Sequence, residues 1–442
     1  MFSEDKTSIA VWVNRSLDLY EKGDYESAEN LCIKILKTDS SNQTAWINLG
    51  NIRFLRRDFK GAAKAYKKAD SFSKNNVLAK VNLANVFLEQ GDFYAAYKKA
   101  KQALLSDSCN LMAGSILGSA CLSLEKYSEA VEVFLMLVKL DPADAWNYNY
   151  LSQAYEKNGD YSKACEAAWQ ALKLEPANDS HHLNFAYLLY DMALEKRLEE
   201  AQKYAENWLR NFPENPIASH LGNALCGKEK IERANEGYLV DTFDVFAPDF
   251  EGVLKKLEYK VPAYVKEYLT EFYGRKNMEK LQILDAGCGT GLCGKEIKKI
   301  LPQSLIYGVD LSEKMLDEAR KKNIYAVLEK ADLSDCLSAF ASKFDLIVSG
   351  DVFTYFGRLD SLFEKLCLSL KKNGRIIFSV SENSLTEDDF FLHLSGRFLH
   401  SENYIKNILK NSGFRLEKME KKHLRFEGEN DVFGFMVSAI KI

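Results

Sequence analysis

The sequence of 442 residues has little proline and no long apolar stretch. Its seven prolines give no sign of a long disordered tail or a low-complexity region. No window approaches the roughly 18 uninterrupted apolar residues that a membrane-spanning helix needs. Glu4 and Asp5 precede the first apolar stretch, which is the wrong order for a signal peptide. We therefore expect no export, no membrane span and a cytoplasmic location.

Metal-binding and nucleic-acid-binding patterns are also missing. The nine cysteines never form a CxxC pair, and the six histidines lack the spacing of metal ligands. This predicts reduced thiols and no metal site. The net charge is −4, and no run of like charges is long enough for a nucleic-acid-binding arm or a polybasic membrane patch. We therefore expect no nucleic acid, membrane or metal among the partners.

The N-terminal half contains an internal repeat. Alanine recurs with a spacing of 34 residues at positions 28, 62, 96, 130 and 164, and again at position 201 after three extra residues. A Gly-Asp-aromatic turn recurs in register at residues 23–25, 91–93 and 159–161. The pattern resembles the tetratricopeptide repeat (TPR) over residues 9–214, about six helix pairs. This implies an all-α solenoid with a concave groove, closed by a capping helix at residues 216–226.

Asparagine occupies one position of the first helix in four of these repeats, at Asn14, Asn48, Asn82 and Asn184. A side-chain amide both donates and accepts, so such a row can pair with the backbone of an extended peptide. On this interpretation the partner is a protein or peptide bound in the groove. Alternatively, each asparagine bonds only within its own repeat.

From residue 281 onward the pattern changes to apolar strands that alternate with amphipathic helices. Strands are predicted at residues 281–286, 305–310, 325–329, 344–349 and 375–380, and a hairpin at 414–421 and 433–440. Right-handed crossovers would join them into a doubly wound, mostly parallel sheet of seven strands. The predicted domains are the solenoid at 1–227, a linker at 228–237 and the α/β domain at 238–442.

A glycine-rich loop, Asp285-Ala286-Gly287-Cys288-Gly289-Thr290-Gly291, follows the first strand and opens a helix. Ligands bind at this edge of an open parallel sheet, and glycine lets a ligand lie directly against the turn. Asp310 ends the second strand, where a carboxylate can accept both hydroxyls of a ribose. Asp332 and Asp351 follow the third and fourth strands. The GxGxG spacing differs from the GxGxxG that nicotinamide-binding domains favour.

This series resembles class I S-adenosylmethionine-dependent methyltransferases over residues 240–442. The whole chain resembles predicted bacterial methyltransferases with N-terminal TPR repeats, through residues 238–262, 350–355 and 395–401. The resemblance implies S-adenosylmethionine as cofactor and S-adenosylhomocysteine as product. It implies a helical lid ahead of the sheet, with Phe246, Phe250 and Tyr259 pointing towards the cofactor. It assigns these residues to cofactor binding: Asp285, Gly287, Cys288, Gly289, Gly291, Asp310, Leu311, Asp332, Leu333 and Asp351.

Within that assignment, Asp285 and the glycines face the methionine moiety, Asp310 the ribose, and Asp332 with Leu333 the adenine. Lys260 stands where the resembling group has arginine. If that position serves the cofactor's carboxylate, lysine keeps the charge but loses the bidentate geometry.

Candidates for the acceptor side follow the fourth and fifth strands. His400 is the best candidate for a general base, because the ordinary pKa of histidine lies near working pH. It can equally bond a loop or cap the helix that starts at Ser401. Arg397 can hold a carboxylate or brace its loop, and Tyr355 is the third candidate.

Three functions remain open from the sequence. The first is a methyltransferase whose solenoid recruits a protein partner or protein substrate. The second is a methyltransferase for a small or carrier-bound carboxylic acid held by Arg397. The third is a TPR scaffold whose methyltransferase fold senses the cofactor without turnover.

Overall fold

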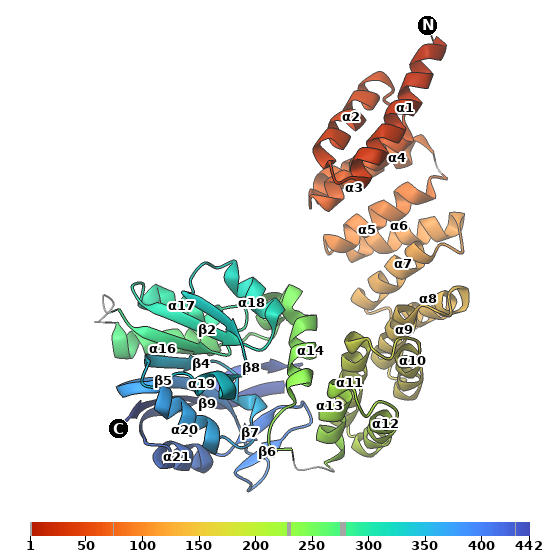
Figure 1. Cartoon of the computed structure of the whole chain (residues 1–442). Helices are drawn as coiled ribbons and strands as arrows, with labels where there is room; N and C mark the ends of the chain where they lie inside the picture. Colours follow the sequence, from red (N-terminus) through yellow and green to blue (C-terminus); the bar gives the residue numbers. More distant parts are fainter. Residues whose placement is uncertain (1, 74, 228–230, 275–279, 429) are drawn as a thin grey trace. The chain divides into compact units, whose positions relative to one another are not determined.

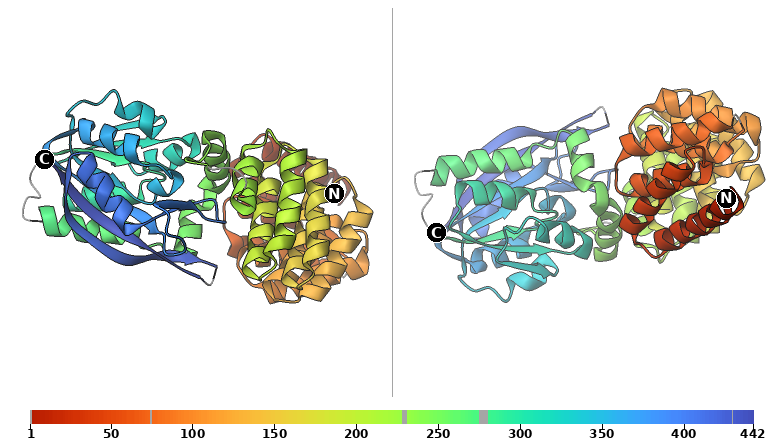
Figure 2. Two further views of the ribbon diagram at one scale, coloured as in Figure 1. Left: turned by 90° about the horizontal axis from the view of Figure 1, so that it is seen from below. Right: turned by 90° about the horizontal axis from the view of Figure 1, so that it is seen from above.

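The computed structural model describes residues 2–73, 75–227, 231–274, 280–428 and 430–442. The chain forms two units with separate internal packing, Met1–Pro176 and Ala177–Ile442. Figures 1 and 2 show both units. Each is described by itself.

The first unit is a stack of helix pairs. Its helices in the described residues are α1 (Phe2–Glu21), α2 (Tyr25–Thr38), α3 (Gln43–Leu55), α4 (Phe59–Phe72), α5 (Val77–Glu89), α6 (Phe93–Ser106), α7 (Leu111–Ser123), α8 (Tyr127–Leu140), α9 (Ala145–Lys157) and α10 (Tyr161–Leu174). Each helix packs against the next along the chain. This is the helix-pair arrangement that the 34-residue period predicts.

Capping residues recur with the same period. The side chains of Asp24, Asp58, Asp92 and Asp160 each accept a hydrogen bond from a backbone N–H in the first turn of the second helix of a pair. Asn42, Asn76 and Asn110 cap first helices in the same way. Each cap satisfies a backbone donor that the helix itself leaves unpaired. The repeat therefore specifies the N-terminal end of both helices in a pair.

Small residues bring the two helices of a pair together. A Cβ atom on Gly50 of α3 would lie 2.3 Å from Cε1 of Tyr66 on α4. A Cβ atom on Gly118 of α7 would lie 2.4 Å from Cζ of Phe134 on α8. The aromatic ring of the second helix therefore fills the space that the glycine of the first leaves open.

The second unit begins with three helices, α11 (Asp179–Leu194), α12 (Leu198–Asn211) and α13 (Pro216–Cys226). The remaining helical elements are α14 (Glu236–Phe246), η1 (Ala247–Asp249), α15 (Phe250–Lys256), α16 (Val261–Tyr273), α17 (Leu292–Ile300), α18 (Glu313–Arg320), α19 (Leu333–Leu337), η2 (Phe353–Tyr355), α20 (Asp360–Ser369) and α21 (Glu402–Asn411).

A mixed sheet forms the centre of this unit (Figure 1). Its strands are β1 (Gln282–Ala286), β2 (Leu305–Asp310), β3 (Val327–Lys330), β4 (Phe344–Ser349), β5 (Leu370–Glu382), β6 (Phe390–Leu392), β7 (Phe398–His400), β8 (Phe414–Glu427) and β9 (Asn430–Lys441). Strands β3, β2, β1, β4 and β5 are parallel neighbours in that order. The antiparallel hairpin of β8 and β9 pairs with β5 through β9. Helices α16 and α17 pack on one face, and α19, α20 and α21 on the other.

The predicted α/β fold is confirmed, with one correction to the number of strands. Within the described residues the sheet has nine strands, not seven. The two additional strands, β6 and β7, have three residues each and form a small hairpin, in which β7 runs parallel to the end of β5. Three residues are too few for an alternating apolar pattern to be recognised in the sequence.

The segment predicted as a linker is held by the α/β domain where it is described. Residues 228–230 lie outside the described residues. Beyond them, Ala234 N donates to Tyr355 O at 2.9 Å and Gly357 N donates to Glu232 O at 2.8 Å. Helix α14 already begins at Glu236. Residues 231–237 are therefore part of the folded unit and not a free connection.

No helix in the described ranges is long and apolar enough to cross a membrane. The same residues contain no cluster of three or more histidine, cysteine or acidic side chains arranged to hold a metal ion.

Candidate functional site

The glycine-rich loop between β1 and α17 has the backbone conformation that its sequence requires. Gly287, Gly289 and Gly291 have φ angles of +70°, +53° and +91°, a region that residues with a Cβ atom rarely adopt. A Cβ atom on Gly287 would also lie 2.2 Å from Cγ2 of Val352. The loop therefore presents bare backbone beside the end of β4.

Asp310 joins this loop to the end of β2. Its Oδ2 accepts a hydrogen bond from Gly289 N at 2.8 Å, and its Oδ1 accepts one from Ser312 N at 3.0 Å. Burial raises the pKa of this carboxyl group, and the backbone donors act against the increase. A carboxylate has about four acceptor sites, so each oxygen keeps one for a ribose hydroxyl.

Asp285 lies under the loop. Its Oδ2 accepts a hydrogen bond from the Tyr325 hydroxyl at 2.7 Å. Its Oδ1 is buried and has no hydrogen-bond partner among the residues that the structure describes. Burial raises the pKa of Asp285 to about 7. A buried acceptor without a donor is costly, and a cationic ligand group such as an ammonium would supply one.

A cavity lies over the loop and the carboxyl ends of the strands. The predicted site residues that line it are Gly287, Cys288, Gly289, Asp310, Leu311, Asp332, Leu333, Asp351, Tyr355 and Arg397. Asp285, Gly291 and His400 are not among the lining residues. Ten of the thirteen predicted cofactor and catalytic residues thus meet around one cavity.

Helices α14 and α15, which precede the sheet in the sequence, cover this cavity with aromatic side chains. Phe250 and Tyr259 line it, as the resemblance implies, but Phe243 does so in place of Phe246. The ring of Phe243 lies 5.6 Å from that of Tyr355 and 6.1 Å from that of Phe250. Lys260 points elsewhere, because its Nζ lies 3.0 Å from Nδ1 of His423 on β8. The expectation that Lys260 serves the cofactor's carboxylate is therefore not supported.

At the adenine end of the predicted site, both carboxylate oxygens of Asp332 have partners within the protein. Its Oδ1 accepts hydrogen bonds from Ser334 N at 2.9 Å and Asp335 N at 3.3 Å, so it caps α19. Its Oδ2 pairs with Arg233, in the segment predicted as a linker. Arg233 had no signal in the sequence as a site residue.

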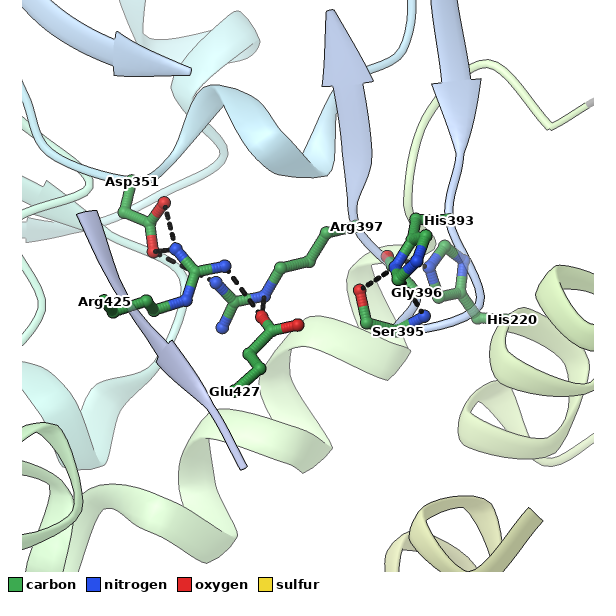
Figure 3. Close-up of polar contacts among 8 residues, drawn as sticks. All are labelled: His220, Asp351, His393, Ser395, Gly396, Arg397, Arg425 and Glu427. Carbon is green, nitrogen blue, oxygen red and sulfur yellow. Dashed lines mark hydrogen bonds and ion pairs between the residues drawn. The ribbon is translucent and has the colours of Figure 1, made fainter. Parts of the chain in front are cut away.

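Two arginines and two acids meet at the other end of the cavity (Figure 3). Asp351 accepts hydrogen bonds from Nη1 of Arg397 at 3.1 Å and from Nη1 of Arg425 at 3.0 and 3.1 Å. Glu427 accepts a further bond from Nη2 of Arg425 at 2.8 Å. Asp351 has a φ angle of +60°, which is strained for a residue with a side chain and is typical of functional sites.

Arg425 is the main residue of this cluster that sequence reasoning missed. Its side chain is 1% exposed, although it sits in a strand rich in charged residues. The register of β8 shifts between His423 and Arg425, so the adjacent Leu424 and Arg425 are both buried. An irregularity of this kind redirects a side chain next to a site, and no sequence pattern identifies it.

The structure does not support His400 as the general base. Its ring is fully buried, and Nε2 lies 2.8 Å from Phe356 O and 3.1 Å from Gly357 O. Because carbonyl oxygens only accept, Nε2 carries the proton. Burial lowers the pKa of His400 to about 4. His400 thus ties β7 to the segment after β4, which is the structural role that the sequence left open.

The asparagine row is partly used inside the solenoid. Asn48 Nδ2 donates to Ser16 Oγ at 3.2 Å, and Asn82 Nδ2 donates to Asn51 Oδ1 at 3.1 Å. Asn14 is exposed, and Asn184 is half-buried on α11 in the second unit. For Asn48 and Asn82 the bonds connect neighbouring helix pairs, so these two residues do not bond only within their own repeat, contrary to what the second interpretation of the row expects.

These residues fit S-adenosylmethionine. The loop backbone and the free acceptor sites of Asp310, both of which line the cavity, offer partners for the polar groups of the cofactor. The aromatic lid offers contacts for the apolar parts of the cofactor.

Comparisons with known proteins agree with this geometry. Residues 277–423 match the family model described as a methyltransferase domain. Residues 13–76, 81–145 and 133–166 match tetratricopeptide repeat models.

Curated relatives of the α/β domain include two malonyl-[acyl-carrier protein] O-methyltransferases. The one from Acetivibrio thermocellus is 25% identical over 41% of this chain and 71% of its own length. The one from Legionella pneumophila is 32% identical over 31% of this chain and 47% of its own length. The chain thus spans less than half of the second relative.

A solved structure of magnesium protoporphyrin IX methyltransferase from Synechocystis with bound SAH is also similar, with 19% identity and a TM-score of 0.39. The similarity covers 47% of this chain and 100% of that one. By the family models and the curated relatives, the chain combines tetratricopeptide repeats with an S-adenosylmethionine-dependent methyltransferase domain.

Proposed function

We propose that this protein methylates a carboxylate oxygen on an acceptor that a protein carries, and that its TPR solenoid recruits that protein. The observation that carries the proposal is the position of Arg397 at the end of the cavity. Its guanidinium has five donors, and its one side-chain hydrogen bond among the described residues runs from Nη1 to Asp351. Its Nε also lies 3.7 Å from Oε1 of Glu427, and the remaining Nη donors are suited to the two oxygens of a carboxylate.

The chemistry of the cavity also favours a carboxylate. The described lining residues include neither histidine nor lysine. Asp332 and Asp351 are engaged with arginines, and burial raises the pKa of Tyr355. None of these groups is a ready base at neutral pH. A carboxylate is already ionised there and needs none.

The reaction balances without a proton transfer. When bound, S-adenosylmethionine supplies an electrophilic methyl group on a sulfonium. One carboxylate oxygen forms the new O–C bond while the C–S bond breaks and its electron pair stays on sulfur. The products are a methyl ester and S-adenosylhomocysteine. The task of the protein is to hold the oxygen in line and to exclude water.

The relatives support the same class of acceptor. The two described above are named for methylation of malonyl groups on an acyl-carrier protein. A carrier-bound carboxylic acid also gives the solenoid a task, because the carrier is a protein that a groove can bind. Asn14 remains a candidate for that groove in the first unit, whereas Asn48 and Asn82 would have to exchange their present partners.

The direct test uses methyl-labelled S-adenosylmethionine with malonyl-acyl carrier protein as the probe. We expect label on the malonyl form and none on the carrier that lacks the acyl group. Alkali should release the label as methanol, because an ester hydrolyses and an N-methyl group does not. Alkali-stable label would contradict the proposal, as would no transfer to the probe.

Arg397→Gln should raise the KM for the malonyl probe by about tenfold or more, since one charge-assisted hydrogen bond is worth roughly 1.5–3 kcal/mol. The affinity for S-adenosylmethionine should change little. Arg320→Gln is the matched control, because Arg320 is 45% exposed on α18 and pairs with the exposed Glu313 and Asp317 of its own helix. An unchanged KM in Arg397→Gln would remove Arg397 from acceptor binding.

A further inference from the structure

Arg397 belongs to a tight turn that joins β6 to β7. His393 N donates to Arg397 O at 2.9 Å, and Gly396 N donates to His393 O at 2.9 Å. Ser395 Oγ lies 2.9 Å from Nδ1 of His393 and braces the turn from inside. Gly396 has a φ angle of +77°. The sequence therefore builds a rigid turn directly before the arginine at the cavity.

Helix α13 packs against the outside of this turn (Figure 3). A Cβ atom on Gly396 would lie 2.4 Å from Cδ2 of Leu221 and 3.1 Å from the hydroxyl oxygen of Tyr238. Only glycine allows so close an approach with this backbone conformation. The solenoid's capping helix and the methyltransferase domain thus meet at the residue that precedes Arg397.

His220 on α13 makes the polar contact at this point. Its Nε2 lies 2.8 Å from Gly396 O, its side chain is 2% exposed, and its ring stacks on Tyr238 at 4.2 Å. A carbonyl oxygen only accepts, so Nε2–H of His220 donates the bond. Burial lowers the pKa of His220, which keeps the imidazole neutral.

This bond adds to the turn's own hydrogen bonds in orienting the backbone of Arg397. The carbonyl of Gly396 and the N–Cα bond of Arg397 share one planar peptide unit. Holding the carbonyl oxygen therefore holds the Cα atom from which the side chain of Arg397 extends. At the other end, the guanidinium is held by Asp351 at 3.1 Å.

Helix α11 adds an aromatic contact to the same turn. The ring of Tyr190 lies 6.2 Å from that of His393, in an edge-to-face arrangement. Helices α11 and α13 come from the sequence region read as the last repeat and its cap. The turn that carries Arg397 is therefore supported by helices of the solenoid pattern.

We propose that His220 is a positioning residue for methyl transfer: through Gly396 O it orients Arg397 so that the guanidinium can receive the acceptor's carboxylate. The expected effect of His220 on acceptor binding rests on the proposed function, whereas its effect on the orientation of Arg397 does not. It makes the end of the solenoid part of the acceptor site.

The test uses the full chain with three variants of α13. His220→Phe keeps a ring to stack on Tyr238 but removes the donor. His220→Gln keeps an N–H donor and removes the ring. Asn223→Ala is the matched control, because Asn223 is a buried polar residue of the same helix and its Nδ2 donates to Ser219 O within that helix.

The first readout needs no acceptor. Phenylglyoxal modifies guanidinium groups, and mass spectrometry gives the rate at each arginine. In His220→Phe the rate at Arg397 should rise at least threefold, while the rate at Arg320 stays constant. His220→Gln should return Arg397 to within twofold of the wild-type rate, and Asn223→Ala should not change it. A wild-type rate in His220→Phe would overturn the proposal.

The second readout is methyl transfer to malonyl-acyl carrier protein. His220→Phe should raise the KM for the carrier at least fivefold and leave the affinity for S-adenosylmethionine within twofold, with rescue by His220→Gln. Equal losses of acceptor and cofactor binding would overturn the proposal, since they would indicate general unfolding. If the wild-type chain does not methylate the probe, the proposed acceptor is wrong, and the rate at Arg397 alone decides the role of His220.

Discussion

At the scale of single residues, the site contains carboxylates in very different environments. Asp310 accepts two backbone hydrogen bonds, and Asp351 is bound by two arginines. Asp285 has one tyrosine hydroxyl and an unpaired buried oxygen. Burial raises the pKa of Asp310, where the backbone donors act against the increase, and it also raises the pKa of Asp285. Its raised pKa of about 7 has a measurable consequence.

Asp285 should make the cofactor-free protein less stable as the pH rises. A carboxyl group with a raised folded-state pKa is penalised above its unfolded pKa of about 3.9, and the penalty is complete above its folded pKa. The penalty grows by roughly 1.4 kcal/mol per pH unit between these values. Asp285→Asn removes it, so the variant should gain on the order of 2–3 kcal/mol relative to wild type between pH 5 and pH 8.

Urea titrations read out by pulsed hydrogen–deuterium exchange measure this gain for the second unit alone. Asp317→Asn is the control, because Asp317 is 59% exposed on α18. Its difference from wild type should stay constant with pH. A constant difference for Asp285→Asn as well would refute the account of Asp285.

Site residues could be predicted from the sequence where their role depends on the conformation of a nearby turn or strand end. They could not be predicted where their role depends on packing against elements distant in the chain. Gly287, Gly289 and Asp310 lie in a loop and at a strand end that their own spacing predicts. Whether His400 lines a cavity or lies buried depends on elements distant in the chain. The inward orientation of Arg425 depends on a local shift of strand register. Neither has a periodic signal in the sequence.

At the scale of elements, the turns between the two helices of a repeat share a left-handed backbone conformation, which different residues adopt in different repeats. Gly23, Gly91 and Gly159 have φ angles of +79°, +75° and +84°. In the intervening repeats Arg57 and Glu125 adopt φ angles of +58° and +59° at the equivalent turns. A left-handed conformation costs roughly 1–2 kcal/mol for a residue with a side chain. Replacing such a residue with glycine should therefore stabilise its repeat.

Glu125→Gly should stabilise the first unit by about 1 kcal/mol, because glycine adopts this conformation without strain. Thermal unfolding measured by circular dichroism should show a higher midpoint. Glu132→Gly is the matched control on the exposed face of α8, where the same substitution should cost about 1 kcal/mol. A lower midpoint for Glu125→Gly would contradict this reading of the turn.

Most of the elements could be predicted because their patterns are long. Strands β2 and β4 have the predicted bounds, since each is a buried parallel strand between turn residues. The hairpin of β6 and β7 was not predicted, and its formation depends on contacts with β5 and α13. The element that carries Arg397 is thus the one with the weakest local signal.

At the scale of the whole molecule, the boundary that the repeat pattern indicates differs from the boundary between the two packed units. The solenoid pattern extends to α13, but residues from Ala177 onward pack as one unit with the methyltransferase domain. The bond from His220 to Gly396 O and the stacking of His220 on Tyr238 belong to that packing. Helices α11 to α13 are therefore expected to be required for the integrity of the acceptor site.

Two fragments test this division. Residues 177–442 should fold and bind S-adenosylmethionine within about threefold of the full chain. Residues 231–442 lack the helices that cover Tyr238 and the turn at Gly396, and should unfold at a lower temperature. Loss of the first unit should raise the KM for malonyl-acyl carrier protein about tenfold and leave that for malonyl-coenzyme A unchanged. Equal stability of the two fragments would refute the division at residue 177.

The most direct test of the account is a calorimetric titration of the full chain with S-adenosylmethionine, with Asp310→Ala as the comparison. The account predicts binding in the micromolar range for the wild-type chain. It predicts a loss of at least tenfold in the variant, because two hydrogen bonds to a carboxylate are worth roughly 1.5–3 kcal/mol each. No binding by the folded wild-type chain, or equal binding by Asp310→Ala, would contradict the assignment of this cavity to the cofactor.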